Sequence, residues 1–133
     1  MRRVFADSFY FFALVSEDDG KHADAIEFAA TFEGEIITTR WVLTEVADGL
    51  AKPPWRETIA VLYERLIRNP SVRIVSCSDS LFDEGIALYR GRQDKSWSLT
   101  DCISFVVMKK EQLQEALTGD RDFEQAGFIA LLK

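Results

Sequence analysis

The sequence from Ser98 to Met108 is SLTDCISFVVM, which joins a helix start to the most apolar helical stretch of the chain. Ser98 and Asp101 have the spacing of a capping box, in which two side chains satisfy backbone N–H groups of the first turn. The residues that follow are apolar on nearly every side of the helix. A helix over Leu99–Leu113 should therefore be central and buried.

Strands and helices alternate on both sides of this segment. Short runs rich in β-branched or aromatic residues predict strands at Arg2–Ala6, Glu35–Thr39, Val72–Ser76, Glu115–Thr118 and Phe128–Leu132. Helical patterns lie between them, at Ser8–Val15, Lys21–Phe32, from the cap residue Thr39 to about Ala51, at Trp55–Arg68, and from a Ser80–Asp83 capping box through Tyr89. Arg90–Trp97 is expected to be a polar loop. This alternation favours a parallel sheet with helices on both faces.

The bulk composition is that of one globular domain. The chain has 133 residues, of which 47% are hydrophobic and 29% charged, so we predict a single domain over residues 1–133. No apolar run approaches the roughly 20 residues that a membrane-spanning helix needs. The first acid, Asp7, comes too early for a secretory signal. We therefore expect a cytoplasmic protein without a membrane partner.

Cysteine and histidine are too scarce to carry most site chemistries. Cys77 and Cys102 are the only cysteines, and both are expected to be buried free thiols because their neighbours are apolar. His22 is the only histidine, and it is expected on the surface. Zinc sites and Ser-His-Asp triads are therefore disfavoured. Oxygen ligands remain, and these suit Mg²⁺ or Mn²⁺.

Four acids lie where an apolar run meets a turn or a helix end: Asp7, Glu45, Asp101 and Asp120. Each has an ordinary alternative role, as a turn acid, an exposed helix residue or a helix cap. If folding brings them together, their charges oppose one another's ionisation, and a divalent cation would offset that cost. The net charge of −6 disfavours nucleic-acid binding unless a metal neutralises the acids and the basic residues are locally grouped.

Three segments of the chain resemble the PIN-domain ribonucleases, especially the VapC-type toxins of toxin–antitoxin pairs. They are Val4–Tyr10 (VFADSFY), Asp94–Met108 (DKSWSLTDCISFVVM) and Ala116–Phe128 (ALTGDRDFEQAGF). Thr44-Glu45-Val46 matches the family's helical glutamate more weakly. The resemblance implies a PIN-like three-layer α/β/α sandwich with a central, mostly parallel sheet.

The resemblance also implies a site. Its catalytic acids would be Asp7, Glu45, Asp101 and Asp120, and its metal ligands Asp7, Asp101, Asp120 and Asp122. Asp122 stands where the family often has another residue, which leaves open whether Asp120 or Asp122 is the fourth ligand. Ser8 and Thr118 match positions that orient the acids or a bound water.

The implied function is hydrolysis of RNA phosphodiester bonds with Mg²⁺ or Mn²⁺, as the toxin partner of an antitoxin protein. The alternatives are a housekeeping PIN nuclease in RNA processing, a PIN-fold binding protein that does not cleave, and a metal phosphatase. Candidate RNA-binding residues are Arg90, Arg92, Lys95, Trp97 and Arg121. In the alternative interpretation the loop is only solvated, and Trp97 is anchored in the core.

Two protein partners are compatible with the sequence. An antitoxin could fill an apolar groove between the helices Trp41–Leu50 and Trp55–Leu66. The aromatic stretch Phe9–Phe12 could support a homodimer or, alternatively, pack in the core.

Overall fold

The computed structural model describes residues 1–133 and contains one five-stranded sheet. Its strands are β1 (Arg3–Ala6), β2 (Glu35–Thr39), β3 (Val72–Val75), β4 (Glu115–Leu117) and β5 (Ile129–Ala130). Their order in the sheet is β3-β2-β1-β4-β5, and every neighbouring pair is parallel. The strands predicted from sequence are confirmed, and the sheet is parallel throughout.

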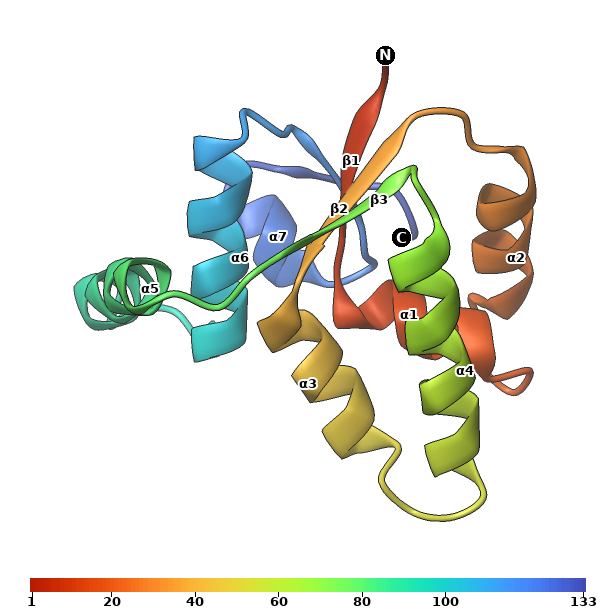
Figure 1. Cartoon of the computed structure of the whole chain (residues 1–133). Helices are drawn as coiled ribbons and strands as arrows, with labels where there is room; N and C mark the ends of the chain where they lie inside the picture. The colour runs from red at the N-terminus through yellow and green to blue at the C-terminus, as the bar shows by residue number, and fades with distance from the viewer.

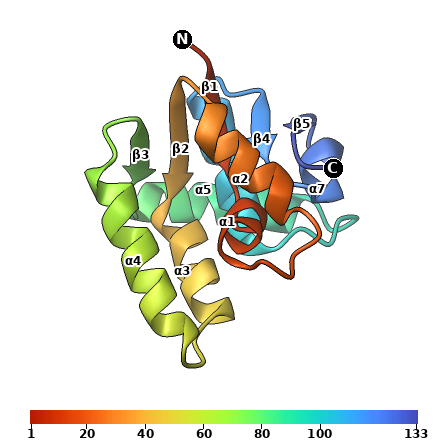
Figure 2. The same cartoon turned by 90° about the vertical axis from the view of Figure 1, so that its right-hand side faces the viewer.

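Helices cover both faces of the sheet, which confirms the three-layer α/β/α fold. They are α1 (Ser8–Val15), α2 (His22–Thr31), α3 (Arg40–Gly49), α4 (Trp55–Arg68), α5 (Asp79–Gly91), α6 (Leu99–Lys110) and α7 (Arg121–Gln125). Figure 1 shows the sheet from its β3 edge, with α5, α6 and α7 on one side and α1, α2 and α4 on the other. Figure 2 shows α1, α2 and α4 in front of the strands, and α3 running beyond the end of β2. None of the helices has the length and apolar character needed to cross a membrane.

The core forms around β1 and α6, as the apolar segments predict. Val4, Phe5 and Ala6 of β1 are all 0% exposed because β1 lies between β2 and β4 in the middle of the sheet. Seven of the twelve residues of α6 are buried, so this helix has no fully polar face.

The parallel arrangement brings the carboxyl ends of all the strands to one edge of the sheet. The chain leaves β1 at Asp7, β2 at Arg40 and β4 at Thr118, and each exit leads to that edge. Ligands of open α/β sheets bind in this region. We call it the carboxyl edge.

The start of α5 differs from the prediction. Ser78 has an extended backbone, and its Oγ accepts a hydrogen bond from the N–H of Leu81 at 3.1 Å. The predicted Ser80–Asp83 capping box is therefore wrong, since a cap-forming serine occurs two residues earlier. The helix also continues to Gly91, which shortens the predicted Arg90–Trp97 loop.

Two further predictions about burial have clear outcomes. Cys102 is buried as expected, but Cys77 is exposed because it lies in the connection that leaves the edge strand β3. The aromatic stretch of α1 supports the core alternative, since Tyr10 is 4% and Phe11 0% exposed.

The short helix α7 was not predicted, because five residues are too few to show a helical period.

Candidate active site at the carboxyl edge

Asp7 is the most buried acid of the carboxyl edge, at 3% exposure. The Thr118 hydroxyl donates a hydrogen bond to its Oδ2 at 2.9 Å, whereas its Oδ1 is buried without a partner. Burial raises the pKa of Asp7 to about 6, although hydrogen bonds from Thr118 and from the Ser8 backbone oppose the rise. The side chain is thus costly to ionise unless positive charge is nearby.

Glu45 reaches the site from α3, whose start is fixed by a cap. The Thr39 Oγ accepts from the N–H of Val42 at 3.1 Å, as the sequence predicts. Glu45 lies half-buried on the flank of α3 while Asp48 is exposed, again as predicted from the helical angles. The Ser8 hydroxyl donates a short hydrogen bond of 2.5 Å to Glu45 Oε1.

Asp101 caps its own helix and also lies beside the other acids of the candidate site. Its N–H donates to Ser98 Oγ at 3.0 Å, and the Ser98 N–H donates to Asp101 Oδ2 at 3.3 Å, so the predicted capping box is confirmed. Burial, with a smaller contribution from the charge of Asp7, raises the pKa of Asp101 to about 7. The two carboxylates therefore lie close enough to repel each other.

Asp120 and Asp122 are placed by the turn between β4 and α7. The Asp120 N–H donates to Thr118 Oγ1 at 3.1 Å, and Asp120 Oδ1 accepts from the Asp122 N–H at 2.9 Å. Thr118 therefore contacts both Asp7 and Asp120. Burial raises the pKa of Asp122, and the Asp120 charge adds to the rise.

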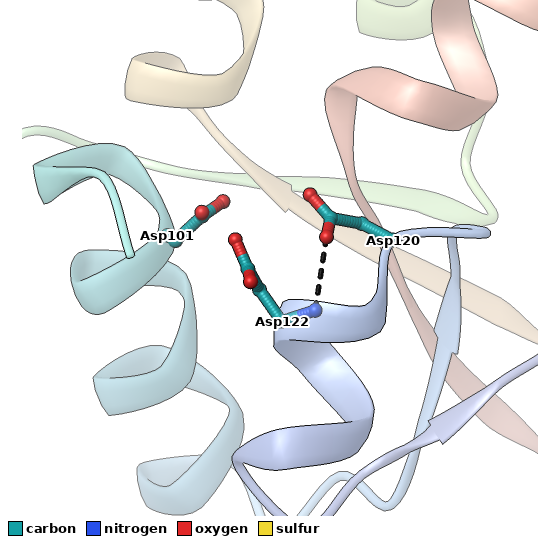
Figure 3. Close-up of side chains that lie close together, drawn as sticks. All are labelled: Asp101, Asp120 and Asp122. Carbon is teal, nitrogen blue, oxygen red and sulfur yellow. Dashed lines mark hydrogen bonds between the residues drawn. The ribbon is translucent and has the colours of Figure 1, made fainter. Parts of the chain in front are cut away.

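The carboxylates of Asp101, Asp120 and Asp122 converge. One oxygen from each lies within 4.8 Å of the other two, and Figure 3 shows the three side chains pointing toward one another from α6, from the turn before α7 and from α7. Asp120 and Asp122 are therefore both in reach of one ion. Asp7 and Glu45 adjoin this group, since the charges of Glu45 and Asp120 both raise the pKa of Asp7.

The donor set is suited to a hard divalent cation. It consists of carboxylate oxygens, which Mg²⁺ and Mn²⁺ prefer, and it lacks the histidine or thiolate of a typical zinc site. The unpartnered Oδ1 of Asp7 is a buried acceptor that a cation would satisfy. The residues present therefore fit such an ion.

Trp97 is not available for base stacking, which corrects one of the RNA-binding candidates. Its ring is 6% exposed, packs edge-on against Phe105 at 5.0 Å, and donates from Nε1 to Gln125 at 3.2 Å. The structure thus supports the alternative in which Trp97 anchors the loop in the core.

The cationic candidates fall into two groups. Arg92 binds Asp94 through two hydrogen bonds of 3.0 and 3.1 Å and covers the Trp97 ring, and Lys95 lies 3.9 Å from the same carboxylate. Arg90 and Arg121 are exposed, and neither takes part in an ion pair within 4.0 Å. The positive charges of Arg90 and Arg121 are therefore not paired with an acid of the protein.

An all-parallel α/β/α sandwich with carboxylates gathered at its carboxyl edge is the architecture of the PIN domain. The family model for the PIN domain matches residues 4–129, so the chain belongs to this family. It is similar to the 23S rRNA-specific endonuclease VapC20 of Mycobacterium tuberculosis, with 28% identity over 127 residues that cover 95% of each chain.

Solved structures give the same fold. The crystal structure of M. tuberculosis VapC20, described as a sarcin–ricin loop cleaving toxin, superposes with a TM-score of 0.86 and 25% identity over 98% of this chain and 99% of that one. FitAcB from Neisseria gonorrhoeae has a TM-score of 0.66 at 15% identity, covering 98% and 96%. VapBC2 from Rickettsia felis, bound to promoter DNA, has a TM-score of 0.68 at 13% identity, covering 97% of both. At these identities, the similarity to FitAcB and VapBC2 shows a shared fold only.

Proposed function

We propose that the protein is a divalent-metal-dependent endoribonuclease that acts as the toxin of a toxin–antitoxin pair. The observation that carries this proposal is the convergence of three carboxylates within 4.8 Å beside the buried, unpartnered oxygen of Asp7. Membership of the PIN family and similarity to an endonuclease toxin support it. The metal would be Mg²⁺ or Mn²⁺.

In this mechanism Asp7, Asp101, Asp120 and Asp122 would hold the metal. When bound, the ion would lower the pKa of the attacking water and offset charge on the phosphoryl oxygens. Thr118 links the Asp7 carboxylate to the backbone N–H of Asp120, and Ser8 donates to the Glu45 carboxylate.

With no histidine at the site, a carboxylate takes the proton of the attacking water. Glu45 is the proposed acceptor because its carboxylate lies at the flank of the cluster, next to Asp7. We assign the substrate phosphates to Arg121 and Arg90, whose guanidinium groups are free of acid partners. Arg92 and Lys95 would first have to leave Asp94.

The test is cleavage of an RNA by purified protein with and without Mg²⁺ or Mn²⁺. An rRNA fragment containing the sarcin–ricin loop is the first probe, because the VapC20 relative is described as cleaving that loop. Asp7→Asn and Asp101→Asn should abolish cleavage while the fold remains intact. Wild-type activity in either variant contradicts the site. Hydrolysis of p-nitrophenyl phosphate without RNA cleavage would favour a phosphatase instead.

An apolar groove offers a place for the antitoxin. The groove predicted between α3 and α4 has a volume of only about 140 Å³. A larger one of about 750 Å³ lies on the other side of α4, against α1 and α2, and is lined mainly by apolar side chains such as Leu14, Ile26 and Val61. We assign an amphipathic segment of the antitoxin to this larger groove.

The groove assignment is tested with the product of the neighbouring gene. Val61→Asp should weaken its binding at least tenfold, because the groove loses an apolar wall. Ile67→Asp is the matched control, since Ile67 is equally exposed on α4 but does not line the groove. Equal affinities of the two variants would contradict the assignment.

Self-association is assigned to α5 rather than α1. Phe82 and Tyr89 are 41% and 50% exposed and lie seven residues apart, so they share one face of α5. Sedimentation analysis of Phe82→Ser tests this, with a shift to monomer as the expected outcome.

A further inference from the structure

Ser104 is a polar residue in the most buried part of α6, and its hydroxyl has no hydrogen-bond partner. The residue is 0% exposed, and Oγ is one of the few buried side-chain atoms left unpaired. Serines inside helices often donate to the carbonyl four residues earlier, but Ser104 does not. An unpaired buried hydroxyl is destabilising relative to a methyl group, so this residue calls for an explanation beyond packing.

The position of Ser104 along α6 can be fixed from neighbouring contacts. Ser104 follows Asp101 by one helical turn, and Asp101 is close enough to Asp7 for that charge to raise its pKa. The next residue, Phe105, packs edge-on against Phe123 at 4.9 Å. The segment 101–105 of α6 therefore runs from the acids into the core.

Contacts with strand β1 give the same position for Ser104. The Phe123 ring lies 6.4 Å from that of Phe5 in β1, which places Phe5 under the Phe105 end of the segment. Phe5 and Asp7 are two residues apart and so point to the same face of the sheet. Ser104 thus lies over the part of β1 between Phe5 and Asp7, as the inner neighbour of the acid site.

A second unpaired oxygen occurs in this place. Apart from Ser104, the unpaired buried atoms are Asp7 Oδ1 and Glu84 Oε2, and the latter lies 3.0 Å from Lys110 Nζ in an ion pair. Asp7 Oδ1 can only accept, whereas a serine hydroxyl can donate. The two groups are chemically complementary, and α6 carries Ser104 over the end of β1 that leads to Asp7.

We propose that Ser104 is a positioning residue of the acid site, whose hydroxyl holds the inner oxygen of Asp7 through one ordered water. A carboxylate oxygen has two lone-pair directions, so Asp7 Oδ1 can accept from this water and still face the ion. Thr118 fixes Oδ2 from the other side, and the two contacts together set the carboxylate plane. This inference rests on the proposed function, because the oriented carboxylate is a ligand of the proposed metal.

The test is Ser104→Ala, which removes one buried oxygen and leaves the apolar environment intact. Mutation of a group that orients a metal ligand typically lowers metal affinity or activity 10–100-fold. We expect Mn²⁺ affinity, measured by titration calorimetry or electron paramagnetic resonance, to fall roughly 10-fold. The kcat/KM for RNA cleavage should fall by a similar factor, and the metal-free variant should still fold, because only one buried oxygen is removed.

Ile103→Val is the matched control. Ile103 is 1% exposed on the same helical turn but faces α5, where it touches Gly85. The Tm of this variant should fall slightly, and its Mn²⁺ affinity should equal that of the wild type. The comparison separates a general effect of core packing from a role of the Ser104 hydroxyl.

Each outcome decides the inference. If Ser104→Ala binds Mn²⁺ and cleaves RNA within twofold of the wild type, the hydroxyl has no role in the site and only the inference fails. If Ile103→Val weakens Mn²⁺ binding as much as Ser104→Ala, the effect is general packing and the inference also fails. A wild-type protein that neither binds Mn²⁺ nor cleaves RNA would overturn the proposed function together with the inference.

Discussion

Asp7 illustrates at the scale of one residue how a carboxylate can reduce the stability of the fold that holds it. Its pKa is raised by burial from 3.8 to about 6, so the folded protein holds this proton more tightly than the unfolded chain. A raised pKa gives stability that is fully present below the unfolded value and is lost as the pH rises through the folded value. Without metal, the contribution of Asp7 to stability therefore falls between about pH 4 and pH 6.

Asp7→Asn should remove this penalty. In EDTA at pH 8 we expect the variant to be more stable than the wild type by up to about 3 kcal/mol, which corresponds to the rise in the pKa of Asp7. At pH 4 the two proteins should differ little, because Asp7 is then protonated in the folded state. Urea unfolding at both pH values measures the difference. A variant that is equally or less stable at pH 8 would show that the burial of the Asp7 carboxylate does not destabilise the fold.

Two serine caps allow the site to be tested at the scale of the element. Ser98 and Ser78 both accept a first-turn N–H, at 3.0 and 3.1 Å, at the starts of α6 and α5. Replacing either with Ala should cost about 1 kcal/mol in thermal unfolding. Ser98→Ala should in addition weaken Mn²⁺ binding, because the N–H that it caps belongs to Asp101. Equal Mn²⁺ affinities in the two variants would show that the α6 cap does not position this carboxylate.

The elements also show where sequence reasoning succeeds. The helix α6 and the strand β1 are recognisable because burial on all sides leaves long apolar runs. Asp7 and Asp120 can be placed at the sheet edge because each directly follows a strand, and parallel strands end together. The acid at 101 carries a capping signal of its own.

Other features depend on tertiary contacts and leave little trace in the sequence. Whether Trp97 faces RNA or the core depends on its packing against Phe105 and its hydrogen bond to Gln125, which is 28 residues away. The sequence leaves open whether Asp120 or Asp122 is the fourth ligand. That both carboxylates lie near Asp101 depends on α7 starting at Arg121, and a five-residue helix has no periodic signal. Ser78 and Ser80 both fit a cap by residue type, and in the structure Ser78 takes this position.

At the scale of the molecule, the gathered acids couple metal binding to folding and to pH. The raised pKa values of Asp7 and Asp101, about 6 and about 7, mean that protons compete with the metal at pH 5. At a metal concentration of 100 times Kd, binding stabilises a protein by about 2.7 kcal/mol. Mg²⁺ or Mn²⁺ should therefore raise the Tm by several degrees at pH 8 and by much less at pH 5. Equal shifts at both pH values in a calorimetric scan would place the metal away from these acids.

The net charge of −6 makes RNA binding depend on a few local cations rather than on the field of the whole protein. Each Lys or Arg that contacts a phosphate contributes about one unit to the dependence of log affinity on log salt. Arg121→Gln should therefore lower kcat/KM at low salt and make its salt dependence shallower by about one.

Arg56→Gln is the control for Arg121→Gln. Arg56 is exposed without an acid partner near the start of α4, where α3 and α4 extend beyond the sheet, and its guanidinium binds the Ala51 carbonyl at 3.0 Å. This variant should keep the wild-type salt dependence, because Arg56 lies near the start of α4, whereas Arg121 directly follows Asp120 of the candidate site. A slope that changes equally in both variants would mean that RNA responds to total charge, and Arg121 would then have no specific role at the carboxyl edge.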